Sequence, residues 1–186
     1  MKSLLAFVSV AAIGGYVAFQ QLPSGEARAT PARLTEGTVA SITLDGQNLP
    51  LAALRGVMDT RPGASLDHDV LAHDRAAMSA ALVARGFLAA SVKPAVITWA
   101  DDAAYISYEV AQGPMFRIGK VTVTGATDKD AVITISSGDD AIASRIESAR
   151  QILADNLARH GKRHDVEITQ TVDRAASVVD VTLATR

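Results

Sequence analysis

The sequence contains no cysteine, few aromatic residues and little net charge, and each shortage excludes a class of protein. Without cysteine, the 186-residue chain forms no disulfide bond and has no thiol to carry a lipid. Aromatic residues make up 4% of the chain and the formal net charge is -2, which provides no basic surface for nucleic acid. Because 48% of the residues are hydrophobic, we expect a folded chain with a buried core. Neither a cofactor nor nucleic acid is expected to bind.

The N-terminus has the features of an export signal. Lys2 precedes an apolar run over residues 4–19, and a break rich in proline and glycine leads to a small-residue triplet that ends at Ala29. The run has no polar face and is shorter than the ~20 residues that span a bilayer comfortably. We therefore interpret residues 1–29 as a signal peptide or as an N-terminal membrane anchor. Both interpretations place the rest of the chain outside the cytoplasmic membrane.

A regular motif predicts a helix that ends at a glycine. Asp74, Met78, Leu82 and Gly86 are four residues apart, which aligns them on one helix face, and Phe87 follows the glycine. Asp74 interrupts an otherwise apolar stripe. We expect Asp74 to hold a local hydrogen bond rather than to catalyse a reaction. The chain also has no Gly-x-Ser-x-Gly elbow and no phosphate-binding loop. An enzyme is therefore not predicted.

The helix motif occurs twice. Gly63 and Gly138 are 75 residues apart, as are Gly86 and Gly161, and the stretches between these glycines align without a gap. Such a period indicates duplication. We predict an α+β fold of two tandem β-α-α-β-β modules, residues 35–112 and 113–186, each a three-stranded mixed sheet with two helices on one face. The second copy is the weaker match, because Ala149 replaces Asp74 and Lys162 replaces Phe87.

The motif residues resemble those of the POTRA (polypeptide-transport-associated) domains of BamA- and TamA-like outer-membrane assembly factors. The resemblance is carried by Asp74, Gly86, Phe87 and the Gly113-Pro114 pair, which precedes an aromatic and an isoleucine. It implies a periplasmic scaffold that assists the assembly, insertion or secretion of outer-membrane proteins. The implied partners are outer-membrane barrel precursors or subunits of the assembly machine, and the implied role is chaperone-like.

The free strand edge of the first module is the predicted partner site. If the strand over 39–44 pairs with the strand over 104–110, residues 91–98 form an unpaired edge. The resemblance implies that this edge binds partner strands by β-augmentation. Pro94 fits an edge strand, and it is equally consistent with an edge that is blunted and idle. The predicted contact residues are Ser91, Val92, Lys93, Ala95, Val96, Ile97 and Thr98.

Two clusters of charged residues have competing interpretations. The acidic and histidine residues between Asp67 and Asp74 do not share one helix face, so we predict a helix start and no metal site. Around Gly161 the chain carries a basic cluster, which either complements the end of a helix or contacts an anionic membrane surface or an acidic partner. The basic cluster consists of Arg159, Lys162, Arg163 and His164.

A membrane-anchored division or cell-wall scaffold is the alternative function. A single-spanning protein with one POTRA module also resembles FtsQ-type division proteins, which need an anchor. Cleavage after Ala29 would disfavour this alternative, whereas an intact span would favour it.

Overall fold

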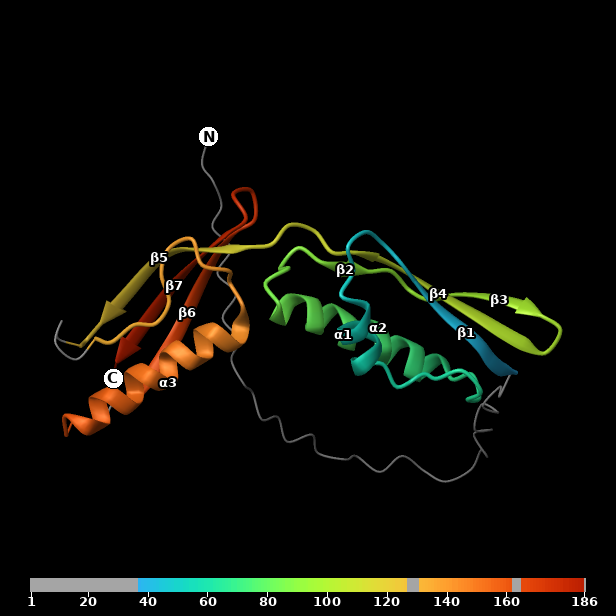
Figure 1. Ribbon diagram of the computed structural model, residues 1–186, viewed down its shortest axis with the longest axis horizontal. Helices are drawn as coiled ribbons and strands as arrows, with labels where there is room; N and C mark the ends of the chain where they lie inside the picture. The colour runs from blue at the N-terminus through green and yellow to red at the C-terminus, as the bar shows by residue number, and fades with distance from the viewer. Residues whose placement is uncertain (1–36, 127–130, 162–164, 186) are drawn as a thin grey trace, which may run out of the picture. The chain divides into compact units, whose positions relative to one another are not determined.

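The computed structural model describes residues 37–126, 131–161 and 165–185, which fold into two mixed β-sheets and three helices (Figure 1). The mixed α+β class predicted from the sequence is confirmed. None of the helices in these ranges is long and apolar enough to cross a membrane. The predicted signal peptide or anchor, residues 1–29, lies outside the described residues.

The first sheet is built around β4 (Ala103–Ala111). On one side, β1 (Thr38–Asp45) pairs with β4 in parallel. On the other side, β2 (Ser91–Val92) and β3 (Val96–Ala100) pair with β4 antiparallel, one after the other. The pairing of the first strand with the central strand agrees with the prediction, and it leaves β1 at one edge and β2 with β3 at the other.

Two helices cover one face of this sheet, α1 (Leu51–Val57) and α2 (His68–Ala84). Asp67 caps α2 by accepting hydrogen bonds from two backbone N–H groups of the first turn. The four-residue spacing places Met78 and Leu82 on the buried face, where each contributes about 1.5–3 kcal/mol. Alternate residues of β4 point into the same core: Ala104, Ile106, Tyr108 and Val110.

The second sheet has the order β5-β7-β6. In it, β5 (Arg117–Thr124) is parallel to β7 (Val178–Thr185), and β6 (Val166–Asp173) is antiparallel to β7. A single helix, α3 (Ala143–Arg159), packs its apolar stripe against this sheet. The buried stripe consists of Ile146, Ala149, Leu153 and Leu157.

The two halves of the described structure share helix length and strand pairing. Helices α2 and α3 have 17 residues each, and both their first and their last residues are 75 positions apart. In each sheet the earliest strand is parallel to the latest, and the remaining strands are antiparallel to the latest. The same chain order thus produces the same strand pairing twice.

Two details of the predicted fold are wrong. The predicted strand over 91–98 is interrupted near Pro94, so the first sheet has four strands rather than three. Proline cannot donate a backbone hydrogen bond, and Thr169 occupies the equivalent position in the uninterrupted β6. The second error is the short helix expected before α3, which is absent from residues 131–142. The β-branched run over 132–135 disfavours a helix, and its Ile135 is buried in the core.

Candidate functional site

The edge formed by β2 and β3 is the candidate protein-binding surface. Both strands pair with β4 on one side and have no strand on their other side among the described residues. Of the seven predicted contact residues, five lie in the two strands. Lys93 and Ala95 lie in the interruption between them. The structure therefore divides the predicted edge into a two-residue piece and a five-residue piece.

Lys93, in the interruption between β2 and β3, is bonded to Glu109 of the central strand β4. Its backbone N–H donates to the Glu109 carbonyl oxygen at 2.9 Å, and its Nζ lies 2.7 Å from Glu109 Oε1. The next residue, Pro94, has no N–H group and lies in an irregular stretch, where residues 93–95 lie opposite only two residues of β4. Its missing donor therefore accompanies the interruption of the strand and leaves the edge with one N–H group fewer.

The β3 strand has an apolar, accessible outer surface. Ile97 pairs with Ile106 and packs against the core. Its neighbours Val96 and Thr98 lie opposite Ser107 and Tyr105, on the face that the helices do not cover. Val96 is 62% exposed and Tyr105 is 45% exposed. Five consecutive residues of β3 thus combine an open backbone edge with exposed apolar side chains.

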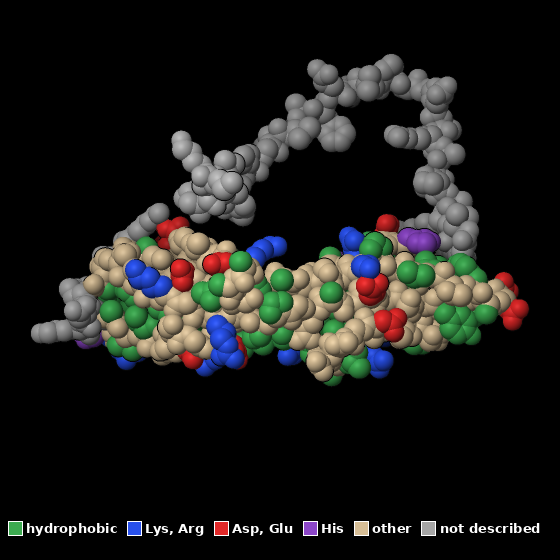
Figure 2. All heavy atoms as spheres, turned by 90° about the horizontal axis from the view of Figure 1, so that it is seen from above, with side chains coloured by type: hydrophobic (Ala, Val, Ile, Leu, Met, Phe, Trp, Pro, Cys, Tyr) green, Lys and Arg blue, Asp and Glu red, His purple; other side chains and the backbone are tan. Residues whose placement is uncertain are grey.

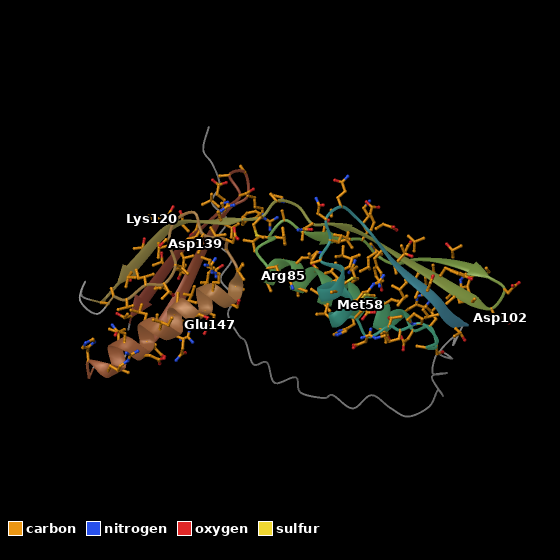
Figure 3. The ribbon with its side chains drawn as sticks, in the orientation of Figure 1. Met58, Arg85, Asp102, Lys120, Asp139 and Glu147 are labelled. Atoms are coloured by element: carbon orange, nitrogen blue, oxygen red, sulfur yellow. The ribbon has the colours of Figure 1, made fainter. Side chains whose placement is uncertain are left out.

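The hairpin that joins β3 to β4 has a tight two-residue tip. Asp101 has a positive φ of 53°, and Asp102, labelled in Figure 3, lies at the tip. Trp99 packs over Gly37, because a Cβ built on this glycine would approach the indole ring to 2.5 Å. The start of β1 therefore holds the hairpin in place.

Charged side chains of both signs are mixed on the face of the molecule that Figure 2 shows. Figure 2 shows acidic and basic side chains scattered over the visible face, with neither sign gathered into one large patch. This distribution is consistent with the formal net charge of -2.

Asp74 joins the helix motif to the preceding loop. Its side chain is fully buried, and its two carboxylate oxygens accept hydrogen bonds from the backbone N–H groups of Asp59 at 2.6 Å and Thr60 at 3.1 Å. Asp74 thus holds hydrogen bonds, but its partners lie 14 and 15 residues earlier in the chain and are not local as expected. These two donors follow α1. The second half has no helix equivalent to α1 in residues 131–142, and there Ala149 occupies the position of Asp74.

Burial and the nearby Asp74 carboxylate both disfavour the phenolate form of Tyr108. Burial, the larger cause, and the negative charge of Asp74 raise the pKa of Tyr108 well above its ordinary value. The neutral hydroxyl donates to the Leu71 carbonyl oxygen at 3.1 Å. Tyr108 therefore connects the central strand to α2 and has no exposed reactive group.

The glycines of the motif are required by the backbone. Gly86 has φ +94°, and its carbonyl oxygen accepts a hydrogen bond from the Phe116 N–H at 2.9 Å. Gly113 also has a positive φ, +70°, immediately before Pro114. Phe87 packs against the core of the first sheet. These residues end α2 and direct the chain into β5, which is a structural role.

The remaining predicted groups are separated in the structure. Asp67 caps α2, and exposed His73 lies 3.7 Å from the Asp59 carboxylate. No group of three or more metal-ligating side chains occurs within the described ranges. Of the predicted basic cluster, Arg159 is exposed in the last turn of α3, whereas Lys162, Arg163 and His164 lie outside the described residues.

Sequence reasoning did not identify a second feature, a cavity beside β1 that is lined by Arg55 and Arg61. The two arginines come from α1 and from the loop after it, and they follow no periodic pattern. Only the packing of that loop against β1 brings them to one cavity.

Comparison with known proteins relates the first sheet to a family of domains. Residues 37–113 match the POTRA family model, described as "Surface antigen variable number repeat". No match was found among curated proteins.

Two solved structures show the same fold. POTRA domains 3–5 of BamA from Haemophilus influenzae match with a TM-score of 0.50 and 16% identity, over 81% of this chain and 66% of that chain. BamA from Haemophilus ducreyi lacking POTRA domains 1–3 matches with a TM-score of 0.52 and 17% identity, over 81% of this chain and 29% of that chain. This chain therefore spans just under two thirds of the first structure and less than a third of the second.

Proposed function

We propose, from the match of residues 37–113 to the POTRA family model, that the protein is a non-enzymatic binding scaffold in the assembly or secretion of outer-membrane proteins. The single observation that carries the proposal is the open β2–β3 edge of that domain. It is the place where an extended segment of another protein can add a strand.

The mechanism we propose is β-augmentation along β3. A partner strand pairs with the outward backbone groups of Val96–Ala100, so most of the affinity comes from main-chain hydrogen bonds rather than from a specific partner sequence. Pro94 limits the pairing to this stretch because it provides no donor. Exposed Val96 adds an apolar contact. Such a site suits partners that are unfolded and differ in sequence, as barrel precursors do.

The location and the partners follow from the same proposal. Residues 1–29 would export the chain to the periplasm as a signal peptide or hold it at the inner membrane as an anchor. There, the partners are outer-membrane barrel precursors or subunits of an assembly machine. The likeness of the fold to BamA supports this context.

We extend the proposal to residues 113–186 as a second POTRA-like module. Its support is the strand order β5-β7-β6 and the equal length of α2 and α3. The β6 edge is uninterrupted over eight residues, and residues 169–173 are all exposed. The second module therefore offers a longer edge than the first.

The basic cluster at the end of α3 is proposed as a contact with anionic membrane or with an acidic partner. Exposed Arg159 at the C-terminal end of the helix supports a surface role, and Lys162, Arg163 and His164 follow it in the sequence. Sedimentation with anionic liposomes measures the contact. Unchanged binding after neutralisation of all four residues would remove it from the proposal.

Photo-crosslinking in living cells tests the edge-binding mechanism. A photoreactive phenylalanine derivative replaces Val96, which lies in β3 and is 62% exposed. The control replaces Val83, a valine of the same domain that is 40% exposed on α2. We expect capture of barrel precursors or assembly-machine subunits at Val96 and not at Val83.

The same experiment can refute the proposal. Equal capture at Val96 and Val83 would show that contact is not specific to the edge. Capture of division or cell-wall proteins would support the FtsQ-like alternative instead, which no observation on the described residues favours.

A further inference from the structure

The cavity beside β1 lies at the opposite edge of the first sheet from β2 and β3. It has a volume of about 320 Å³, within the size range of ligand sites. Its walls come from β1 and from the segment that includes the last turn of α1 and the loop after it. Met58, labelled in Figure 3, lies directly after α1. The lining residues are Ala40, Ser41, Ile42, Arg55, Met58, Thr60, Arg61 and Pro62.

The charge of the cavity is one-sided. Arg55 and Arg61 line it together with no acidic side chain, and no ion pair involves either arginine within the described ranges. The nearby Asp59 carboxylate lies instead 3.7 Å from His73 Nε2. Arg61 Nη1 donates to the Thr60 carbonyl oxygen at 2.9 Å, which holds this guanidinium at the wall and leaves its other N–H donors available.

A buried hydroxyl lies in the same wall. Thr60 is only 7% exposed, and its Oγ1 is enclosed by protein atoms and has no hydrogen-bond partner in the part of the chain that is described. Buried polar groups in folded proteins are nearly always hydrogen-bonded, so this hydroxyl has an unused donor next to the two arginines.

The adjacent edge of β1 is open. Its start is covered, because the Val39 carbonyl oxygen accepts from the Gly63 N–H at 2.8 Å and the Val39 N–H donates to the Ala64 carbonyl oxygen at 2.9 Å. Beyond the irregular register between Val39 and Ser41, residues 41–45 pair with β4 alone within the described structure. An extended chain can therefore pair with this edge and reach the cavity at the same time.

We propose that this cavity binds the side-chain carboxylate of a glutamate in an acidic peptide that pairs with the outer edge of β1. The two guanidinium groups match a carboxylate in charge and in the geometry of their donors. The apolar side chains of Ile42, Met58 and Pro62 accommodate the methylene groups of the glutamate, for which a phosphate ion has no equivalent. This site uses the opposite edge from the proposed partner site, so either one can fail without the other.

Peptide binding to the purified full-length chain tests the inference. The probe is a fluorescein-labelled peptide of sequence Thr-Val-Thr-Glu-Thr-Val-Thr, and its partner carries glutamine in place of glutamate. We expect fluorescence anisotropy to report at least about tenfold weaker binding of the glutamine peptide, because a charge-assisted pair is lost. The variants Arg55→Gln and Arg61→Gln should each weaken the glutamate peptide by a similar factor.

Arg75→Gln is the matched control. Arg75 lies on the other side of the domain, in a hollow with Pro94 and Ile97 beside the β2–β3 edge. We expect this variant to bind the glutamate peptide as the original chain does. If Arg75→Gln lost as much affinity for the peptide as Arg55→Gln, the peptide would bind at the other edge or through nonspecific charge attraction, and the inference would be overturned.

Thr60→Val separates binding from folding. Replacement of an unsatisfied hydroxyl by a methyl group should leave the folded state as stable or more stable. It should nevertheless weaken the binding of the glutamate peptide if the hydroxyl donates to the ligand. Equal affinity for the glutamate and glutamine peptides would overturn the inference. Displacement of the peptide by inorganic phosphate but not by acetate would likewise replace it with a free phosphate site.

Discussion

Replacement of Asp74 by alanine is expected to destabilise the first sheet strongly. The carboxylate is fully buried and accepts hydrogen bonds from the N–H groups of Asp59 at 2.6 Å and Thr60 at 3.1 Å. The Asp74→Ala variant leaves both donors without an acceptor in a place that water reaches poorly. It also removes the connection between α2 and the loop after α1.

The magnitude follows from the cost of unsatisfied donors. Each buried donor without an acceptor costs about 1–3 kcal/mol, so two lower the free energy of unfolding by about 2–6 kcal/mol. Asp74→Asn retains one acceptor oxygen but turns an amide group toward the other donor. Its free energy of unfolding should therefore fall by about half as much as that of Asp74→Ala. Asp69→Ala is the control, because Asp69 is an exposed acid in the first turn of the same helix. The Asp69→Ala variant should lose less than about 1 kcal/mol in the free energy of unfolding.

The single tryptophan makes the assay specific to the first sheet. Trp99 lies in β3 and packs over Gly37, so its fluorescence during urea denaturation reports on residues 37–113. Far-ultraviolet circular dichroism reports on both sheets. We expect the fluorescence midpoint to fall in Asp74→Ala, with the slope unchanged. A loss below about 0.5 kcal/mol, or a loss equal to that of Asp69→Ala, would refute the argument that Asp74 supports the loop.

Two further predictions concern Gly86 and Tyr108. Gly86→Ala should lower the free energy of unfolding by about 1–3 kcal/mol, because Gly86 has φ +94° and an added Cβ would lie 2.9 Å from Met115 Sδ. Gly63→Ala should lower it less, because Gly63 has a similar φ of +86° but open space around the added Cβ. Equal losses of stability in the two variants, measured in the same denaturation assay, would contradict the packing argument. Burial, and to a lesser extent the charge of Asp74, raise the pKa of the Tyr108 hydroxyl in the folded protein above its value in the unfolded chain. The neutral phenol therefore contributes stability at pH values below about 10, and this contribution is lost as the pH rises further. Tyr108→Phe should lower the free energy of unfolding by about 0.5–1.5 kcal/mol at neutral pH, because the hydrogen bond to Leu71 is lost. Above pH ~10 the stability of this variant should decline less steeply than that of the original protein. Parallel declines in the two proteins would refute this coupling.

The sequence by itself determined the features that depend on local spacing. The four-residue steps from Asp74 to Gly86 predicted α2 and its end, and the strand over 104–110 was predicted where β4 lies. The period of 75 residues predicted a second helix of the same length. A helix periodicity and a glycine stop act within a few residues, and they are therefore readable without tertiary contacts.

Only the tertiary structure decided which groups meet across longer distances. The partners of Asp74 lie 14 and 15 residues earlier in the chain, and nothing in its own motif identifies them. The split of the edge at Pro94 and the absence of a helix from residues 131–142 were also decided by competition between backbone pairing, core packing and helix propensity. The cavity lined by Arg55 and Arg61 exists because the loop after α1 packs beside β1. Contacts of this kind depend on the relative placement of separate elements, which local residue patterns do not contain.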